Sequence, residues 1–344
     1  MAVEATDEHA PRVADRYDDE AGPVVAALRR RLPAISPTRY RQVLVVALGL
    51  IALIIFTGAL VRLSGSGLGC PEWPSCSLGK VLRAPNDHGR IELFNRYLTG
   101  WIAVAVVVLG LTSIVRKPYR RSLVHLSLLL LVGVVGQALL GGLTVLLKLK
   151  PQAVMGHFLL SIALLSAALI LHDRATQDTA KPELVIVPNP MRFARWVLLG
   201  STACTVVLGT VVTSSGPHGG DDVAERFRYS MRDVARLHSG AAWIAVLSAL
   251  IIGWTYRRPT SVPAAVVQRR ISVLFAALIA QGAVGYLQYL TRVPAWLVAV
   301  HILGVVAIWV SVMRVFFSLR SAASERDRAA DGVGTVRGSP IPMR

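Results

Sequence analysis

Residues 43–61 read VLVVALGLIALIIFTGALV, without a single charged side chain. A helix needs about 20 mostly apolar residues to cross the hydrocarbon core of a membrane. Seven further stretches meet this requirement: 97–115, 123–147, 152–171, 196–213, 239–256, 271–290 and 295–317. We therefore predict an all-α, polytopic membrane protein with eight transmembrane helices.

The composition of the 344-residue chain supports this prediction. Hydrophobic residues make up 53% of the chain and charged residues 17%, and the mean hydropathy is +0.54. Soluble domains carry about 25% charged residues. These figures argue against an ordinary soluble enzyme, and they exclude a collagenous, coiled-coil or disordered chain.

The basic residues predict the orientation of the chain. Lys and Arg number 37 against 20 Asp and Glu, a net charge of +17, and loops on the cytoplasmic side of a membrane collect such residues. Two short loops are dense in them: Arg116, Lys117, Arg120 and Arg121 in one, and Arg257, Arg258, Arg269 and Arg270 in the other. Placing both loops inside puts both termini in the cytoplasm of a plasma-membrane protein, with long outer loops at 62–96 and 214–238. The excess charge then follows from topology, and we expect no binding of nucleic acid.

The second half of the sequence repeats features of the first. Gln137 precedes His157 by the same interval that separates Gln281 from His301. The pattern T-G-x-x-V-R-x-S-G-S-G at the end of the first stretch has a counterpart, L-G-T-V-V-T-S-S-G, at the end of the fifth. We predict two tandem, pseudo-symmetric four-helix bundles of the same orientation, a framework that commonly holds cofactors between its helices.

Five domains and segments follow from this division. A cytoplasmic tail, 1–42, precedes the N-terminal bundle, 43–172. A cytoplasmic linker, 173–195, leads to the C-terminal bundle, 196–317, and 318–344 form a second cytoplasmic tail. Both tails are polar, and we expect them to be disordered.

Among the eight histidines, His157, His238 and His301 lie within apolar stretches or at their outer ends. His125 and His172 lie at inner ends of such stretches, where a structural or interfacial role is favoured. Ionisable residues in membrane helices are functional candidates by default, although a lone histidine also serves as a hydrogen-bonding partner for a neighbouring helix. His238 and His301 share one half and the outer side of the membrane, which favours a pair of metal ligands. Zinc needs a third or fourth ligand, whereas two imidazoles suit haem iron. We therefore predict a bis-histidine haem b.

The first half lacks the fourth histidine. His157 matches His301, but the region that corresponds to His238 reads IELFNR, residues 91–96. Glu92 and Asn95 lie there on one helix face. A haem in this half would have His157 as its one certain protein ligand and an open face beside a carboxylate, as oxygen or water chemistry requires. The alternative for Glu92 is a hydrogen-bonding anchor at a helix N-terminus, where carboxylates are favoured.

The first outer loop contains two of the three cysteines. Cys70 and Cys76 lie close in sequence on the predicted outer side, where disulfides persist, and the Gly and Pro residues around them permit a tight turn. A disulfide is favoured over free thiols, and a zinc site is disfavoured because no further Cys or His lies nearby. Cys204 falls within a predicted span, which indicates a packing role.

Several motifs, in order, resemble those of the heme A synthase family, the membrane enzymes that oxidise heme O. They are RLSGSGLGCPEWPSC at 62–76, IELFNR at 91–96, GHFLLS at 156–161, VVTSSGPHGG at 211–220, RLH at 236–238 and QGAVGYLQYLTRVP at 281–294. The resemblance covers about residues 43–317 and leaves out both tails. A duplicated frame of eight spans is what this resemblance implies for the fold.

The resemblance also implies a reaction and a set of site residues. The C-terminal half would hold haem b through His238 and His301, and the N-terminal half would receive heme O. The C8 methyl of heme O is then hydroxylated twice and loses water, which leaves the formyl group of heme A for terminal cytochrome oxidase. Glu92 matches the family's carboxylate near the reacting site, and the loop cysteines match its cysteine pair. Many members carry a histidine where this chain has Asn95.

Other partners are less well defined by the sequence. Arg62 and Arg96 are candidates for contacts to the haem propionates on charge alone, since both lie at the outer mouth. The lipid bilayer surrounds the spans, and a heme O synthase and an electron donor are the protein partners that such a reaction calls for.

Two other classes of protein remain as alternatives. A di-haem membrane cytochrome b would carry electrons without catalysis, but the missing fourth histidine argues against two equivalent haems. A secondary transporter would also show tandem repeats, yet its polar residues belong at broken helices near the midplane. Here they gather near the predicted outer boundary.

Overall fold

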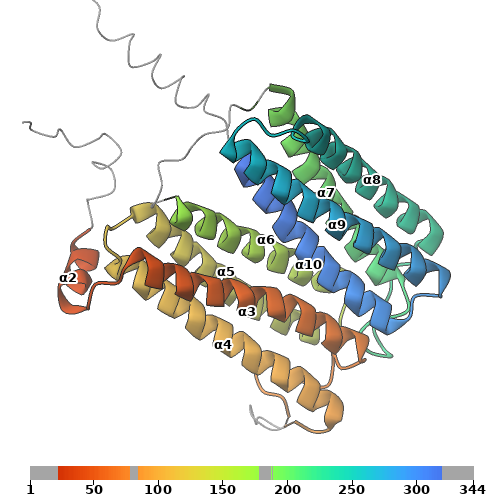
Figure 1. Ribbon diagram of the computed structural model, residues 1–344. Helices are drawn as coiled ribbons and strands as arrows, with labels where there is room; N and C mark the ends of the chain where they lie inside the picture. Colours follow the sequence, from red (N-terminus) through yellow and green to blue (C-terminus); the bar gives the residue numbers. More distant parts are fainter. Residues whose placement is uncertain (1–21, 78–83, 178–186, 188, 320–344) are drawn as a thin grey trace, which may run out of the picture. The chain divides into compact units, whose positions relative to one another are not determined.

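The computed structural model describes residues 22–77, 84–177, 187 and 189–319. Over these residues, eight helices are long and apolar enough to cross a membrane, as Figure 1 shows. They are α3 (Pro37–Leu63), α4 (Asp87–Val115), α5 (Arg121–Leu146), α6 (Pro151–Thr176), α7 (Asn189–Ser215), α8 (Met231–Thr255), α9 (Val262–Leu290) and α10 (Ala295–Ser318). The prediction of an all-α protein with eight candidate spans is confirmed.

Most helices begin earlier than their apolar stretches, and side-chain caps define the start of α3, α4 and α9. Ser36 accepts from the Arg39 amide at 3.3 Å at the start of α3, and Asn86 accepts from the Gly89 amide at 2.8 Å at the start of α4. Such side chains satisfy amide groups that have no partner within the helix. As a result α4 starts at Asp87 rather than near 97, and Glu92 lies inside it. Helix α8 starts at Met231 without a side-chain cap, so that His238 lies within the helix and not at its end.

The expectation of a disordered tail over 1–42 is wrong for its described part. Residues Pro23–Arg31 form helix α2, and α3 already begins at Pro37. The segment PVVAALRRR consists largely of good helix formers after an initial proline, and its basic last turn complements the helix dipole. Residues 1–21 and 320–344, and the linker residues 178–186 and 188, lie outside the described residues.

The chain divides into two compact units. Unit 1 comprises residues 1–179 together with 220–225, and unit 2 comprises 180–219 and 226–344. In unit 1, α3 packs on α4 and α6, and α5 packs on the same two helices. In unit 2, α7 packs on α8 and α10, and α9 packs on the same two helices. Each unit is thus a ring of four helices, while a symmetry axis that relates the units and the domain limits given above stay predictions.

Each helix of a unit sends aliphatic side chains to the unit's centre. Four that are fully buried in unit 1 are Leu44, Leu109, Leu123 and Leu165, one from each helix, and their counterparts in unit 2 are Leu198, Ile252, Leu274 and Val312. Lipid tails are as apolar as leucine, so close packing holds such helices together. This packing gives a firm base for the polar residues toward the outer ends.

The loop that follows α3 packs on the first turn of α4. We call residues 64–77, between α3 and the start of the undescribed segment 78–83, the disulfide loop. Gly69 crosses the first turn of α4 so closely that an added Cβ would lie 2.4 Å from the His88 carbonyl and 2.6 Å from the Gly89 amide nitrogen. Ser66 also hydrogen-bonds His88 Nδ1 at 2.8 Å. Backbone of the loop and backbone of the helix therefore meet without side chains between them.

Replacing Gly69 with Ala should destabilise unit 1 by ~1–3 kcal/mol, because the new methyl group meets backbone atoms that cannot turn away. The measurement is thermal unfolding of the purified protein in detergent. Gly100→Ala on α4 is the control, since no atom lies within 4 Å of a Cβ at that position. Equal unfolding temperatures for both variants and the unchanged protein would contradict the crossing described here.

Candidate functional site

Two histidines of unit 2 face each other across the helix ring. His238 lies on α8 and His301 on α10, each about two turns from the start of its helix. Their ring centroids are 6.3 Å apart, and the ring planes are inclined by 55°. The structure thus brings together the two side chains that the sequence singled out as a pair.

A backbone carbonyl orients the His238 ring, and a glutamine side chain holds the backbone of His301. His238 Nδ1 lies 2.9 Å from the Thr205 carbonyl oxygen, and because a carbonyl only accepts, Nδ1 carries the proton. The lone pair of His238 is then on Nε2, the form in which a neutral imidazole binds metal. The Gln281 amide donates to the His301 carbonyl oxygen at 2.9 Å. His301 Nδ1 is buried and has no hydrogen-bond partner.

Each of these rings rests on a glycine of the neighbouring helix. A Cβ added at Gly209 would lie 3.1 Å from His238 Cε1, and one added at Gly285 would lie 3.2 Å from His301 Cε1. Contacts of 3.0–3.4 Å are tighter than ordinary van der Waals packing. The glycines therefore provide the space that the imidazoles occupy.

The donor set of unit 2 fits a haem. A metal ion lies about 2 Å from a histidine nitrogen that binds it, so two rings at this separation leave room for one ion between them. Among the described residues, no three His, Cys, Asp or Glu side chains gather as a metal site. Two imidazoles alone leave zinc under-coordinated, whereas haem iron takes its remaining ligands from the porphyrin.

His157 of unit 1 has surroundings similar to those of His301, except that its Nε2 also lies 3.4 Å from the Gln137 side-chain nitrogen. Its Cε1 would lie 3.0 Å from a Cβ at Gly141, and its Nδ1 is buried without a hydrogen-bond partner. The Gln137 amide donates to the His157 carbonyl oxygen at 3.0 Å and to Ser161 Oγ at 2.5 Å. Gln137 and Gly141 on α5 thus hold His157 as Gln281 and Gly285 hold His301.

Asn95 occupies the position in unit 1 that His238 has in unit 2. Its Nδ2 lies 4.0 Å from the Cβ position of Gly58 on α3, as the His238 ring lies over Gly209 on α7. Its Oδ1 accepts from the Thr57 hydroxyl at 2.8 Å. An amide therefore stands where a second imidazole would be expected. The contact also identifies Asn95 as the counterpart of His238, whereas the interval between the two repeats alone points to the neighbouring residue.

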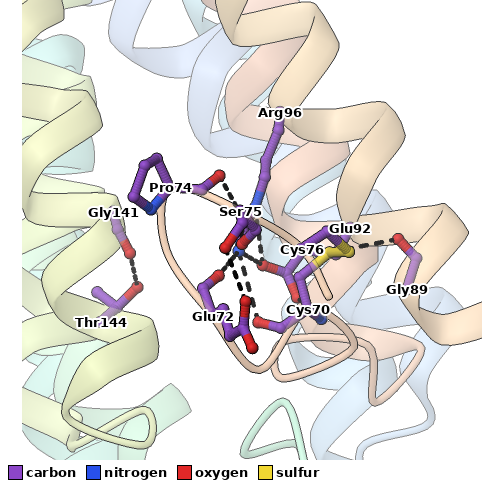
Figure 2. Close-up of polar contacts among 10 residues, drawn as sticks. All are labelled: Cys70, Glu72, Pro74, Ser75, Cys76, Gly89, Glu92, Arg96, Gly141 and Thr144. Atoms are coloured by element: carbon purple, nitrogen blue, oxygen red, sulfur yellow. Dashed lines mark hydrogen bonds and ion pairs between the residues drawn. A yellow bond between two sulfur atoms is a disulfide. The ribbon is translucent and has the colours of Figure 1, made fainter. Parts of the chain in front are cut away.

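The Glu92 carboxylate is turned toward the disulfide loop. Glu92 is only 7% exposed. One oxygen, Oε1, accepts from Arg96 Nη2 at 2.6 Å and Nε at 3.1 Å, and the other, Oε2, accepts from the Cys70 amide at 2.7 Å. Figure 2 shows this cluster. A buried charge needs such partners, because burial without them is costly.

Arg96 donates hydrogen bonds to several carbonyl groups of the disulfide loop. Its Nη1 donates to the Pro74 and Ser75 oxygens at 3.3 and 3.0 Å, and its Nη2 donates to the Cys70 and Glu72 oxygens at 3.5 and 3.1 Å. The fan of dashed lines in Figure 2 converges on this guanidinium. The loop is therefore folded around one cation, and a propionate contact by Arg96 stays a prediction.

The disulfide expected in the outer loop is present. Cys70 and Cys76 are joined at an S–S distance of 2.02 Å, and both are fully buried. Arg62, the other propionate candidate, lies at the end of α3 beside Gly220, where a Cβ would be 3.4 Å from Arg62 Cγ. Cys204 is a free, exposed cysteine on α7.

Sequence reasoning missed several residues that shape the site. Gln137 and Gln281 were noticed as a repeat, and their interval to the histidines was the signal of a role in holding them. Thr57 and Thr205 gave no such signal, because the interval from Thr57 to Asn95 differs from the interval from Thr205 to His238.

Comparison with known proteins identifies relatives of this chain. The family model COX15-CtaA, described as "Cytochrome oxidase assembly protein", matches residues 41–90 and 81–313. A heme A synthase of Shewanella oneidensis is 31% identical over 140 residues, which are 36% of this chain and 41% of that protein.

Other relatives align over more of the chain. A heme A synthase of Listeria welshimeri is 26% identical over 265 residues, 72% of this chain and 85% of that protein. One of Bacillus pumilus is 28% identical over 166 residues, 46% of this chain and 54% of that protein. Because the family model covers most of the eight-span region, the chain belongs to the COX15-CtaA heme A synthase family.

Proposed function

We propose that this protein is a heme A synthase, an oxidoreductase that converts the C8 methyl of heme O to a formyl group by successive hydroxylations. The resulting heme A would serve terminal cytochrome oxidase. The observation that carries the proposal is that the two units differ in their candidate ligands for haem iron. Unit 2 has a facing pair of imidazoles, His238 and His301, 6.3 Å apart, whereas unit 1 sets an amide, Asn95, in the place of one of them.

Unit 2 would hold the resident cofactor, haem b. His238 and His301 are its axial ligands in this proposal, with Thr205 fixing the tautomer of one and Gly209 and Gly285 making room for the rings. A bound haem supplies one-electron transfer. Ligands held by backbone contacts on both sides keep their geometry during such transfer.

Unit 1 would receive heme O. His157, seated on Gly141, is the one protein ligand that we propose for the substrate iron. Asn95 is held by the Thr57 hydroxyl, and an amide is a far weaker ligand of haem iron than imidazole. The opposite face of the substrate would then stay open to an oxidant or to water.

Glu92 is the carboxylate that we propose to handle protons as the methyl group is oxidised. It lies less than one helical turn before Asn95 on α4, and Arg96 and the Cys70 amide hold it in place. A positioned carboxylate serves as an acid or base in this way. The competing role, an anchor for the disulfide loop, is supported by the same hydrogen bonds, so a variant must separate the two.

We also propose that both termini are cytoplasmic in the plasma membrane, as the basic loops at 116–121 and 257–270 suggest. An electron donor and a heme O synthase would be its partners. Labelling of single cysteines introduced into these loops, in intact cells and in opened membranes, tests the orientation. The second candidate, a di-haem electron carrier, lacks a matching histidine pair in unit 1.

His238→Ala and His301→Ala should each remove the low-spin haem b while leaving the protein in the membrane, because insertion depends on the hydrophobicity of the spans. The measurement is the optical spectrum and the extracted haem of purified variants. His125→Ala, at the inner start of α5 in unit 1, is the matched control and should keep the haem. An unchanged low-spin spectrum in both variants would exclude the assigned ligands.

Glu92→Gln should still bind heme O but lower the rate of heme A formation at least tenfold, because the amide keeps the size of the side chain and cannot take up a proton. Asp87→Asn, an exposed acid at the start of the same helix, is the control and should react normally. The measurement is chromatography of haems extracted after turnover. A normal rate would make Glu92 an anchor only, and so would loss of heme O binding together with activity.

A further inference from the structure

Trp73, in the disulfide loop, makes an unusually close contact with α5. A Cβ added at Gly142 would lie 2.5 Å from Trp73 Cδ2 and 2.5 Å from its Cε2. The fused edge of the indole therefore lies directly on the helix backbone. No other residue type fits at position 142 while the indole stays where it is.

This contact lies next to the His157 contact. His157 rests on Gly141 and Trp73 on Gly142, and consecutive residues of a helix differ by about 1.5 Å in height and about 100° in direction. The two rings thus meet α5 at the same depth, on neighbouring faces. Figure 2 shows Pro74, the residue after Trp73, on the side of the loop toward Gly141.

A second contact of the disulfide loop is with the link between α5 and α6. Gly67 donates its amide to the Gly220 carbonyl oxygen at 2.9 Å, and a Cβ at Gly67 would lie 2.8 Å from Leu149 Cδ1. Leu149 belongs to the link between α5 and α6, just before the helix that carries His157. The loop therefore reaches from α4, through Arg96, to both ends of the segment 142–149.

Trp73 is not simply a core residue. Trp73 itself is 36% exposed, so one part of the indole covers Gly142 while another part stays open. The neighbouring Cys70 and Cys76 are fully buried. Trp73 is therefore the large aromatic group of the loop that is both anchored on α5 and accessible beside His157.

We propose that Trp73 is a positioning residue of the substrate site, which holds the disulfide loop against α5 at Gly142 and thereby retains heme O beside His157. The proposal rests on the proposed function of unit 1. Arg96 and the disulfide give the loop its shape. Trp73 fixes the loop to α5, which packs on the helix that carries His157. Loosening the contact between Trp73 and Gly142 opens the loop-covered end of unit 1 without changing His157.

The experiment compares two substitutions that break the same contact from opposite sides. Trp73→Ala removes the indole, and Gly142→Ala pushes it away. Gly136→Ala on the same helix is the matched control, because no atom lies within 4 Å of a Cβ there. Trp73→Phe keeps an aromatic ring over Gly142 and serves as the conservative variant.

Three readouts are taken from the full-length protein in detergent. They are KM and kcat for heme O, the haem b content of unit 2, and the rate at which a water-soluble phosphine reduces the Cys70–Cys76 disulfide in haem-free protein. Trp73→Ala and Gly142→Ala should raise KM about tenfold, which corresponds to about 1.4 kcal/mol. They should leave kcat within about twofold and haem b unchanged, and they should speed disulfide reduction several-fold. Trp73→Phe should restore most of the KM.

Other outcomes would overturn the proposal. A KM and a reduction rate equal to those of Gly136→Ala would show that Trp73 does not hold the loop. Parallel losses of kcat, haem b and protein yield would make it a folding residue. These results leave the proposed function standing if the unchanged protein converts heme O to heme A. Failure of the unchanged protein to bind heme O would overturn both proposals.

Discussion

An imidazole ring packed on a glycine of the neighbouring helix is the contact on which the polar interior of both units depends. It occurs at His238 on Gly209, at His301 on Gly285 and at His157 on Gly141. A membrane helix offers few places for a bulky polar ring, since any larger residue at the glycine would displace it. The ring is then fixed in depth and direction before any ligand arrives, and such preorganisation lowers the cost of binding.

The two units differ in the side chain that packs on the fourth such glycine. In unit 1 the fourth position carries Asn95 over Gly58, with Thr57 as its hydrogen-bond partner. An amide of this size fills the position without supplying a strong ligand for iron. Under the proposed function, unit 2 holds a haem permanently, and unit 1 receives one whose second face is accessible. This division matches what an enzyme with one haem cofactor and one haem substrate requires.

At the end of unit 1 that the disulfide loop covers, a buried ion pair acts together with apolar packing. Glu92 and Arg96 neutralise each other at 2.6 Å, and Arg96 binds four carbonyl groups of the disulfide loop. Because both charges are largely buried, loss of either would leave the other without its opposite charge, at a cost of several kcal/mol. The loop, the disulfide and the carboxylate therefore form one cooperative element.

Much of this structure could be predicted from the sequence, and the failures have physical causes. Long apolar stretches identified all eight spans, because hydrocarbon thickness sets their length. Their starts were missed at Asp87 and Met231, where polar first turns extend the helix beyond the apolar part. The pair His238 and His301 was singled out because both lie in one half and toward one side of the membrane. The partners of Glu92 did not, because they come from a loop distant in sequence, and hydropathy carries no information about such contacts.

The most direct test of the central claim is the ligation of iron in the purified protein loaded with both haem b and heme O. Magnetic circular dichroism and electron paramagnetic resonance distinguish iron with two imidazole ligands from iron with one. The unequal units predict one bis-imidazole, low-spin haem per chain and one heme O whose iron has a single imidazole. Two bis-imidazole haems per chain, or none, would contradict this account.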